Sequence, residues 1–111
     1  MEKEFVTYEL SLKLKELGFD EPCFSFYMGG FKELGKIKYV NPINVAETNV
    51  LAPTFSQAFR WVMQFPQIKK YRYNVALYSD GTYSLKEGKD AIYEYLSAES
   101  CLKKLIEIVE Q

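Results

Sequence analysis

The strongest local signal in the chain is a helix bracketed by two prolines, Pro53 and Pro66. Thr54 and Gln57 have the spacing of a capping box, in which two side chains satisfy backbone amides at the start of a helix. Large apolar side chains such as Phe59 then recur at helical spacing until the second proline, which cannot continue the run. The pattern predicts a helix between the two prolines.

Two further segments predict helices near the ends of the sequence. In the first, Thr7 can cap the opening amides, and Gly18 can adopt the left-handed conformation that closes a helix, with Phe19 folding back as its apolar contact. We therefore expect a helix over residues 8–17. The last segment, residues 101–111, has an apolar stripe at helical spacing and predicts the third helix.

The start of this last helix has two alternatives. Asp90 can cap a long helix, or Ser97 can cap a shorter helix that follows an extended segment over residues 91–95. The sequence leaves both alternatives open.

Two regions between the helices predict antiparallel hairpins. In residues 71–85, Asp80 and Gly81 stand between two β-prone runs and can supply the positive φ angles of a two-residue turn, which would place Tyr78 opposite Tyr83. This signal is local and specific.

The other predicted hairpin pairs residues 23–28 with residues 36–40 through a connection longer than a tight turn. Residues 41–51 have no firm period and are predicted to be an irregular loop. The resulting order is helix, hairpin, helix, hairpin, helix, and no parallel crossover is indicated. We predict an α+β fold in which helices pack on antiparallel strands, in one small domain over residues 1–111.

The composition weighs against most enzyme chemistry. The 111 residues include no histidine, and this removes the commonest general base and the Ser-His and Cys-His triads. Two distant cysteines, Cys23 and Cys101, cannot form a standard zinc site and are expected to be reduced and buried. We therefore predict no enzyme activity, no catalytic residue, no cofactor and no metal site. The mixed charges near the first residue predict a cytoplasmic protein.

Aromatic residues make up 16% of the sequence, and nine of them are tyrosines. One interpretation is a thin core whose rim is formed by tyrosine, because this side chain has an apolar body and a polar tip. The other is an interaction surface built on exposed aromatic side chains around Trp61, Tyr71 and Tyr73. In that case the partner would be another protein or a second copy of this chain.

The one basic and aromatic cluster consists of Lys69, Lys70, Tyr71, Arg72 and Tyr73. On a strand, these side chains could stack on bases and hold phosphates, so the alternative function is binding of single-stranded nucleic acid. The simpler interpretation is a solvated loop that runs into an edge strand, where lysines discourage pairing with other chains. With 14 basic against 15 acidic residues, the whole molecule has no general attraction for phosphate backbones.

Three stretches of the sequence, KEFVTYELSLKLKELGFDEPCFSFY, APTFSQAFRWV and CLKKLIEIVEQ, resemble a family of short uncharacterised proteins from bacterial genomes and prophages. The resemblance covers a little over half of the chain and does not extend to residues 29–51 or 88–97. It implies no activity, cofactor or site residue. It implies a small cytoplasmic protein of mobile-element type that works by binding another macromolecule.

Overall fold

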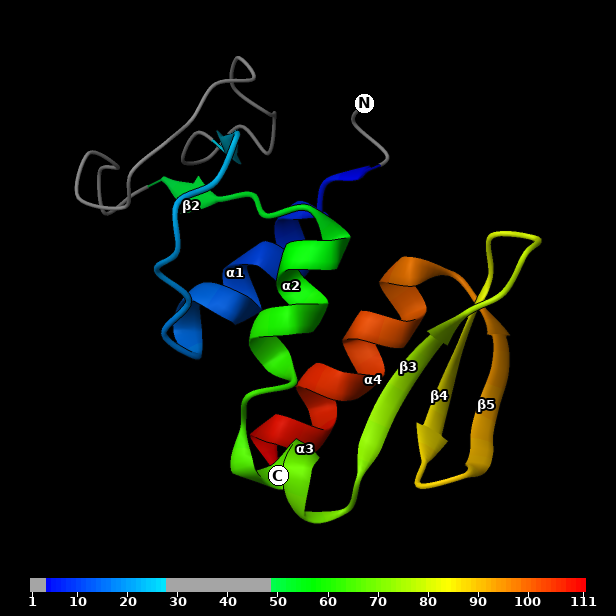
Figure 1. The fold of residues 1–111 in the computed structure, drawn as a ribbon. Helices are drawn as coiled ribbons and strands as arrows, with labels where there is room; N and C mark the ends of the chain where they lie inside the picture. Colours follow the sequence, from blue (N-terminus) through cyan, green and yellow to red (C-terminus); the bar gives the residue numbers. More distant parts are fainter. Residues whose placement is uncertain (1–3, 28–48) are drawn as a thin grey trace. The chain divides into compact units, whose positions relative to one another are not determined.

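The computed structural model describes residues 4–27 and 49–111 and shows helices with antiparallel strands (Figure 1). The predicted α+β class is confirmed. The chain divides into two compact units, unit 1 over residues 1–57 and unit 2 over residues 58–111, and we describe each by itself. The prediction of one domain stays a prediction. Among the described helices, none is both long and apolar enough to span a membrane.

Helix α1 (Tyr8–Glu16) of unit 1 confirms the predicted helix but not both of its end signals. Gly18 has a φ of 102°, and the amide of Phe19 donates to the carbonyl of Leu14 at 2.9 Å, which closes the helix as predicted. The predicted cap at Thr7 is wrong. Its side chain accepts no bond from the first turn, and its buried hydroxyl has no hydrogen-bond partner. Thr7 contributes to the helix through its backbone, because its carbonyl accepts a hydrogen bond from the amide of Ser11 at 2.8 Å.

Unit 1 also contains a two-stranded antiparallel sheet, in which β1 (Phe26–Tyr27) pairs with β2 (Val50–Leu51). The predicted strand over residues 23–28 is thus reduced to two residues, and its predicted partner, residues 36–40, lies outside the described residues. The predicted irregular loop over residues 41–51 needs a correction, because its last two residues form β2. This pairing joins segments far apart in sequence, which local patterns do not reveal.

A compact core lies beneath this sheet, and its four buried members are Phe5, Tyr27, Val50 and Ala52. Tyr27 is 7% exposed, and its hydroxyl donates to the carbonyl of Val6 at 2.7 Å. The ring of Tyr8 meets the ring of Tyr27 edge to face, with 5.6 Å between the centroids. In unit 1 a tyrosine is therefore a core residue whose polar tip is satisfied by the backbone.

Helix α2 (Phe55–Val62) confirms the helix predicted between the two prolines. The hydroxyl of Thr54 accepts from the amide of Gln57 at 3.3 Å, which is half of the predicted capping box. The other half is wrong, because the Gln57 amide group instead donates to the carbonyl of Pro22 at 2.8 Å. Pro66 then begins helix α3 (Pro66–Lys70), which the sequence analysis did not predict. A proline is well suited to this first position, where its missing amide costs nothing.

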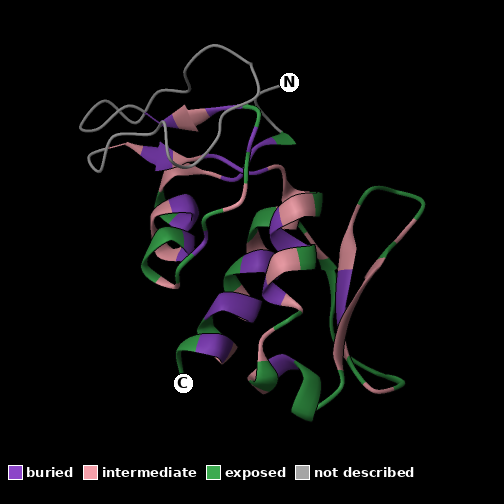
Figure 2. Ribbon diagram, turned by 60° about the vertical axis from the view of Figure 1, so that its left-hand side comes forward, coloured by how far each residue is buried: buried purple, intermediate pink, exposed green. Residues whose placement is uncertain are grey.

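In unit 2, three antiparallel strands form a sheet in the order β3 (Tyr73–Leu77), β4 (Tyr83–Glu87) and β5 (Asp90–Leu96). The third strand extends the predicted hairpin. Neither α3 nor β5 is part of the predicted order, and the first predicted hairpin is not confirmed, because β1 pairs with β2 and residues 36–40 lie outside the described residues. Most positions of the sheet are exposed or half-buried, as the green and pink ribbons in Figure 2 show.

The hairpin between β3 and β4 confirms the prediction for residues 71–85, but the register is displaced by one residue. Tyr83 lies opposite Leu77 and not opposite Tyr78. The reason is a loop of three residues, in which Gly81 has a φ of 88° and donates its amide to the carbonyl of Tyr78 at 3.0 Å. The loop is further held by Asp80, which accepts from the Thr82 hydroxyl and amide, and these bonds lower the pKa of Asp80.

Helix α4 (Ala98–Glu110) decides between the two predicted starts. Ser97 caps it by accepting from the amide of Ser100 at 3.1 Å, and the residues before Ser97 are extended in β5. Its buried stripe includes all four predicted positions, Leu102, Leu105, Ile106 and Val109, together with Cys101. The helix packs against β4, β5 and α3, so it covers one face of the sheet (Figure 1).

Candidate binding site

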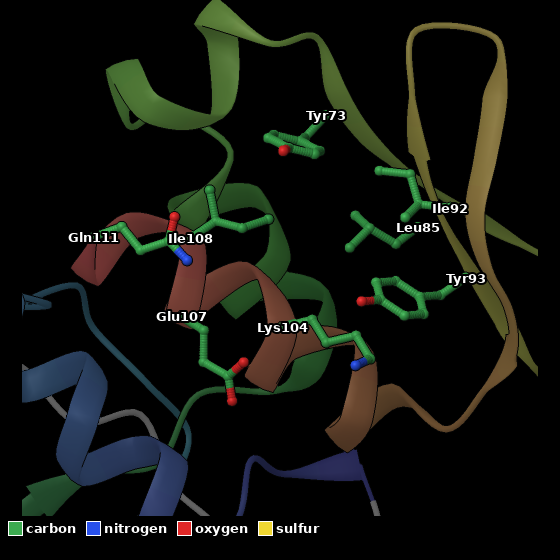
Figure 3. A pocket seen from close by; sticks show the side chains of 8 residues that line it. All are labelled: Tyr73, Leu85, Ile92, Tyr93, Lys104, Glu107, Ile108 and Gln111. Atoms are coloured by element: carbon green, nitrogen blue, oxygen red, sulfur yellow. The ribbon is translucent and has the colours of Figure 1, made fainter.

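A pocket of about 210 Å³ lies in unit 2 between the C-terminal half of α4 and the sheet (Figure 3). Eight side chains line it: Tyr73, Leu85, Ile92 and Tyr93 from the strands, and Lys104, Glu107, Ile108 and Gln111 from the helical side. Its floor is aliphatic, while its polar groups are two phenols, an ammonium, a carboxylate and an amide.

The strand register explains why the sheet side chains converge on this pocket. Val75 lies opposite Leu85, and Leu85 lies opposite Tyr93, so strand alternation brings Tyr73, Leu85 and Tyr93 to one face. Leu85 pairs with Tyr93, whereas the next residue, Lys86, pairs with Ala91, so Ile92 is an extra residue in β5. This bulge turns the neighbours Ile92 and Tyr93 to the same pocket, which a regular strand would not do.

The helix contributes through a second stripe beside its buried one. Lys104, Glu107, Ile108 and Gln111 are spaced by three and four residues, which places them on one side of a helix. The ammonium of Lys104 lies 3.9 Å from the centroid of the Tyr93 ring. Such a cation–π contact contributes about 0.5–1 kcal/mol at an exposed site. It holds the ring of Tyr93 at the edge of the pocket.

The predicted basic and aromatic cluster adjoins this pocket through Tyr73. Lys69 and Lys70 end α3 and are exposed, and β3 begins at Tyr73, so Tyr73 is the one member of the cluster that lies on a strand. Tyr71 is 51% exposed, its ring centroid lies 6.1 Å from that of Tyr73, and the ammonium of Lys70 lies 5.4 Å from its ring. Of the five residues in the cluster, Tyr73 lines the pocket, and the other four precede it in the sequence.

A strained backbone fixes the position of this cluster. Arg72 is exposed and has a φ of 57°, a left-handed conformation that non-glycine residues rarely adopt. Its carbonyl accepts from the amide of Gly88 at 3.0 Å and from the side chain of Asn74 at 3.3 Å. These bonds hold the turn between α3 and β3, so Tyr71 and Tyr73 are presented by a fixed backbone.

Trp61 lies apart from this pocket. Its ring is half-buried and meets the ring of Phe65 at 5.0 Å and a steep angle of 76°. Together with Gln64 and Pro66, these two rings line a separate depression of about 250 Å³. Of the predicted binding residues, the structure therefore brings Lys70, Tyr71 and Tyr73 together and places Trp61 at a different depression.

Neither cysteine is part of the pocket, and both are free and buried, as predicted. Burial, with a smaller effect from the Glu21 charge, raises the pKa of Cys23 to about 12, and burial raises the pKa of Cys101 to about 11. Both thiols are therefore protonated near neutral pH, and a protonated thiol is a poor nucleophile. Within residues 4–27 and 49–111, no three His, Cys, Asp or Glu side chains are grouped so that they could hold a metal ion.

The sequence analysis missed Tyr93 and Lys104, which complete the pocket opposite Tyr73. One signal in the sequence could have identified Tyr93. If residues 91–95 are extended, as one alternative predicted, Ile92, Tyr93 and Tyr95 lie on a strand. No family model matches the chain, and no match was found among curated proteins or solved structures.

Proposed function

We propose that this chain is a non-enzymatic protein-interaction module that binds its partner through the tyrosine surface. We define this surface as Tyr71, Tyr73 and Tyr93 with the pocket that the latter two line. The observation that supports the proposal most is the size of the pocket, about 210 Å³. Pockets for small-molecule ligands usually span about 300–1,000 Å³, so this one suits a single large side chain of a partner protein.

The exposure of the surrounding rings supports the same function. Tyr71 is 51% exposed and Tyr93 is 44% exposed, although burying either ring would remove a large apolar area from water. Tyrosine is enriched among the residues that dominate binding energy at protein interfaces, where truncation typically costs about 2 kcal/mol or more. A partner side chain in the pocket would contact both the aliphatic floor and these rings.

The biological setting rests on the sequence resemblance. A small protein similar to bacterial and prophage proteins fits a cytoplasmic, mobile-element role, and its partner would then be a host or phage protein. This part of the proposal is associative, because a fold does not by itself define a function.

The test begins with affinity capture from lysate of the host cells, with and without nuclease, followed by mass spectrometry. Wild type is compared with Tyr93→Ala and with a matched control, Tyr95→Ala, in the same strand. Tyr95 is 71% exposed and does not line the pocket. We expect a stoichiometric, nuclease-resistant protein partner that Tyr93→Ala loses and Tyr95→Ala retains.

The captured partner is then purified and titrated against the same three proteins. The dissociation constant should rise by about 30-fold or more for Tyr93→Ala, which corresponds to about 2 kcal/mol. It should change little for Tyr95→Ala. Equal affinities for wild type and Tyr93→Ala would contradict the proposal.

One observation favours a second candidate, binding of single-stranded nucleic acid. The contact between Lys104 and Tyr93 is a second basic and aromatic pair, and it borders the same pocket as Tyr73 of the predicted cluster. Stacking on successive rings with phosphates held by lysines is the usual arrangement of such sites. The near balance of charge over the whole chain keeps this candidate second.

Fluorescence anisotropy with a labelled single-stranded oligonucleotide tests this candidate over a range of salt concentrations. A triple variant, Lys69→Ala with Lys70→Ala and Arg72→Ala, should bind more weakly and show a shallower dependence on salt. Unchanged affinity in the triple variant, or binding that does not depend on salt, would exclude the candidate.

A further inference from the structure

The two outer strands of the unit 2 sheet differ in how open they are to further pairing. Strand β5 has two register shifts and a left-handed residue, Tyr95, with a φ of 57°. It also contains the acidic residues Asp90 and Glu94. Bulges and charges are the usual devices that prevent an edge strand from pairing with another chain. Strand β3 has neither, because its register is regular and its sequence YNVAL contains no charge and no proline.

The hydrogen bonds at both ends of the hairpin show which backbone groups of β3 point outward. The amide of Tyr78 donates to Thr82, and the carbonyl of Arg72 accepts from Gly88, so these residues face β4. Antiparallel ladders alternate, and therefore Asn74 and Ala76 also face β4. The remaining residues, Tyr73, Val75 and Leu77, direct their amides and carbonyls away from the sheet. Within the described part of the chain, these outward groups have no hydrogen-bond partner.

We propose that β3 pairs with β3 of a second copy of this chain, antiparallel and with the two-fold axis at Val75. In this register Val75 lies opposite its own copy, and Tyr73 lies opposite Leu77 of the other copy. Every outward amide then meets an outward carbonyl, which no other antiparallel register of these three residues achieves. The result is a continuous six-stranded sheet, and it does not depend on the pocket proposed above.

The side chains agree with this register. Leu77 is 64% exposed, which is unusual for a leucine on the face that α4 covers farther along the sheet. In the proposed pair it would lie beside the ring of Tyr73, and aromatic and aliphatic neighbours across strands stabilise a sheet. No like charges face each other, because β3 contains none. A second copy is thus an occupant that this edge fits along its full length.

Sedimentation equilibrium of the purified protein tests the proposal. A pairing through five residues per strand buries little area, so the series should cover about 10 μM to 1 mM. We expect the mass to rise from that of a monomer to that of a dimer. Leu77→Lys should weaken the dimer by about tenfold or more, and Val75→Pro, which removes an outward amide, should abolish it.

Matched variants on the other edge distinguish pairing through β3 from any other association. Ala91 is exposed in β5 and lies opposite Lys86. Lys86 also pairs with Asn74, and the amide and carbonyl of Lys86 therefore point toward β3 and not toward β5. The amide of Ala91 accordingly points away from the sheet, as the outward amides of β3 do. Ala91→Lys and Ala91→Pro should leave the dimer intact, and circular dichroism should show that all variants are folded. Tyr93→Ala should also dimerise, even if it loses a captured partner.

A protein that stays monomeric at all concentrations would overturn the proposal. A dimer that Leu77→Lys does not weaken, or that Ala91→Lys dissociates, would overturn it as well. Neither result tests the tyrosine surface, although Tyr73 belongs to both surfaces, because that test measures partner binding and not self-association.

Discussion

The two units of this protein use the same residue type in opposite ways. In unit 1, Tyr27 is a core residue: its ring packs against Tyr8, and its hydroxyl donates to the carbonyl of Val6. In unit 2, Tyr71, Tyr93 and Tyr95 leave about half or more of their surface in water. The described tyrosines therefore include two populations, one buried in a core and one whose rings are exposed to water.

This difference bears on the two interpretations of the aromatic content. In unit 1 the tyrosine is part of the core itself and not of its rim, because a backbone carbonyl satisfies the polar tip of a buried ring. In unit 2, exposed rings gather around a pocket, as expected of a binding surface. Exposure, and not residue type, separates the two populations, so substitutions at equivalent rings should have unequal effects on stability.

The largest expected effect is the contrast between Tyr27→Ala and Tyr93→Ala. Removing the buried ring leaves a cavity and takes away one of the two hydrogen-bond donors to the carbonyl of Val6, so we expect a loss of about 3–5 kcal/mol in the free energy of unfolding. Removing the more exposed ring loses the contact with Lys104, about 0.5–1 kcal/mol, and part of the packing beside its cross-strand neighbour Leu85, so the loss should be clearly smaller. Urea unfolding followed by circular dichroism measures both values, and similar losses would break the comparison.

The buried thiols should make stability depend on alkaline pH in both units. Each thiol has an ordinary pKa of 9.0, and folding raises it to about 12 for Cys23 and about 11 for Cys101. Below pH 9 both states keep the proton, so the thiols add no pH dependence. Above pH 9 the unfolded thiols ionise first, and stability should fall as the pH rises toward 11 and 12.

Unfolding experiments between pH 8 and 11 on wild type, Cys23→Ala and Cys101→Ala would check this sign. Each variant should lose part of the alkaline slope, and the Cys23 variant should lose more because its pKa is raised further. An unchanged slope in both variants would show that other groups cause it.

A smaller effect isolates the hydroxyl of the buried tyrosine. Tyr27→Phe keeps the ring and removes one of two donors to the carbonyl of Val6, the other being the Ser11 hydroxyl at 3.3 Å, so it should cost about 0.5–1.5 kcal/mol. Tyr95→Phe, at a ring 71% exposed, should change stability by about 0.5 kcal/mol or less. Equal effects would show that the Ser11 hydroxyl, which also donates to the carbonyl of Val6, satisfies this carbonyl by itself.

The smallest expected effect concerns the contact between Lys104 and Tyr93. Lys104→Met keeps most of the aliphatic stem and removes the ammonium, so stability should fall by about 0.5–1 kcal/mol. In the Tyr93→Ala background the same substitution should have no effect on stability. A double-mutant cycle with zero coupling would show that the contact contributes nothing.

The sequence predicted the elements whose signals are local. The three long helices follow from caps, prolines and apolar stripes, and Ser97 was one of two predicted starts for α4. The hairpin at Gly81 was also predicted, but its register was wrong because the left-handed glycine belongs to a three-residue loop. Helix α3 was missed because Pro66 was interpreted as an end and not also as a beginning.

The tyrosine surface was predicted on one side only. Tyr71 and Tyr73 were identified because they are adjacent to basic residues in the sequence, and their proximity is a local property. Tyr93 and Lys104 reach the same pocket only when a bulged β5 and α4 pack together, and that convergence is tertiary. A single sequence contains no direct signal for it.

The most direct test of the account is covalent labelling of tyrosine in the protein alone and in complex with its captured partner. Mass spectrometry would report the extent of modification at each ring. We predict that Tyr27 stays unmodified in both states, that Tyr71 and Tyr93 are modified in the free protein and protected in the complex, and that Tyr95 is modified equally in both. Equal modification of Tyr93 in the two states would contradict the claim that the tyrosine surface binds the partner.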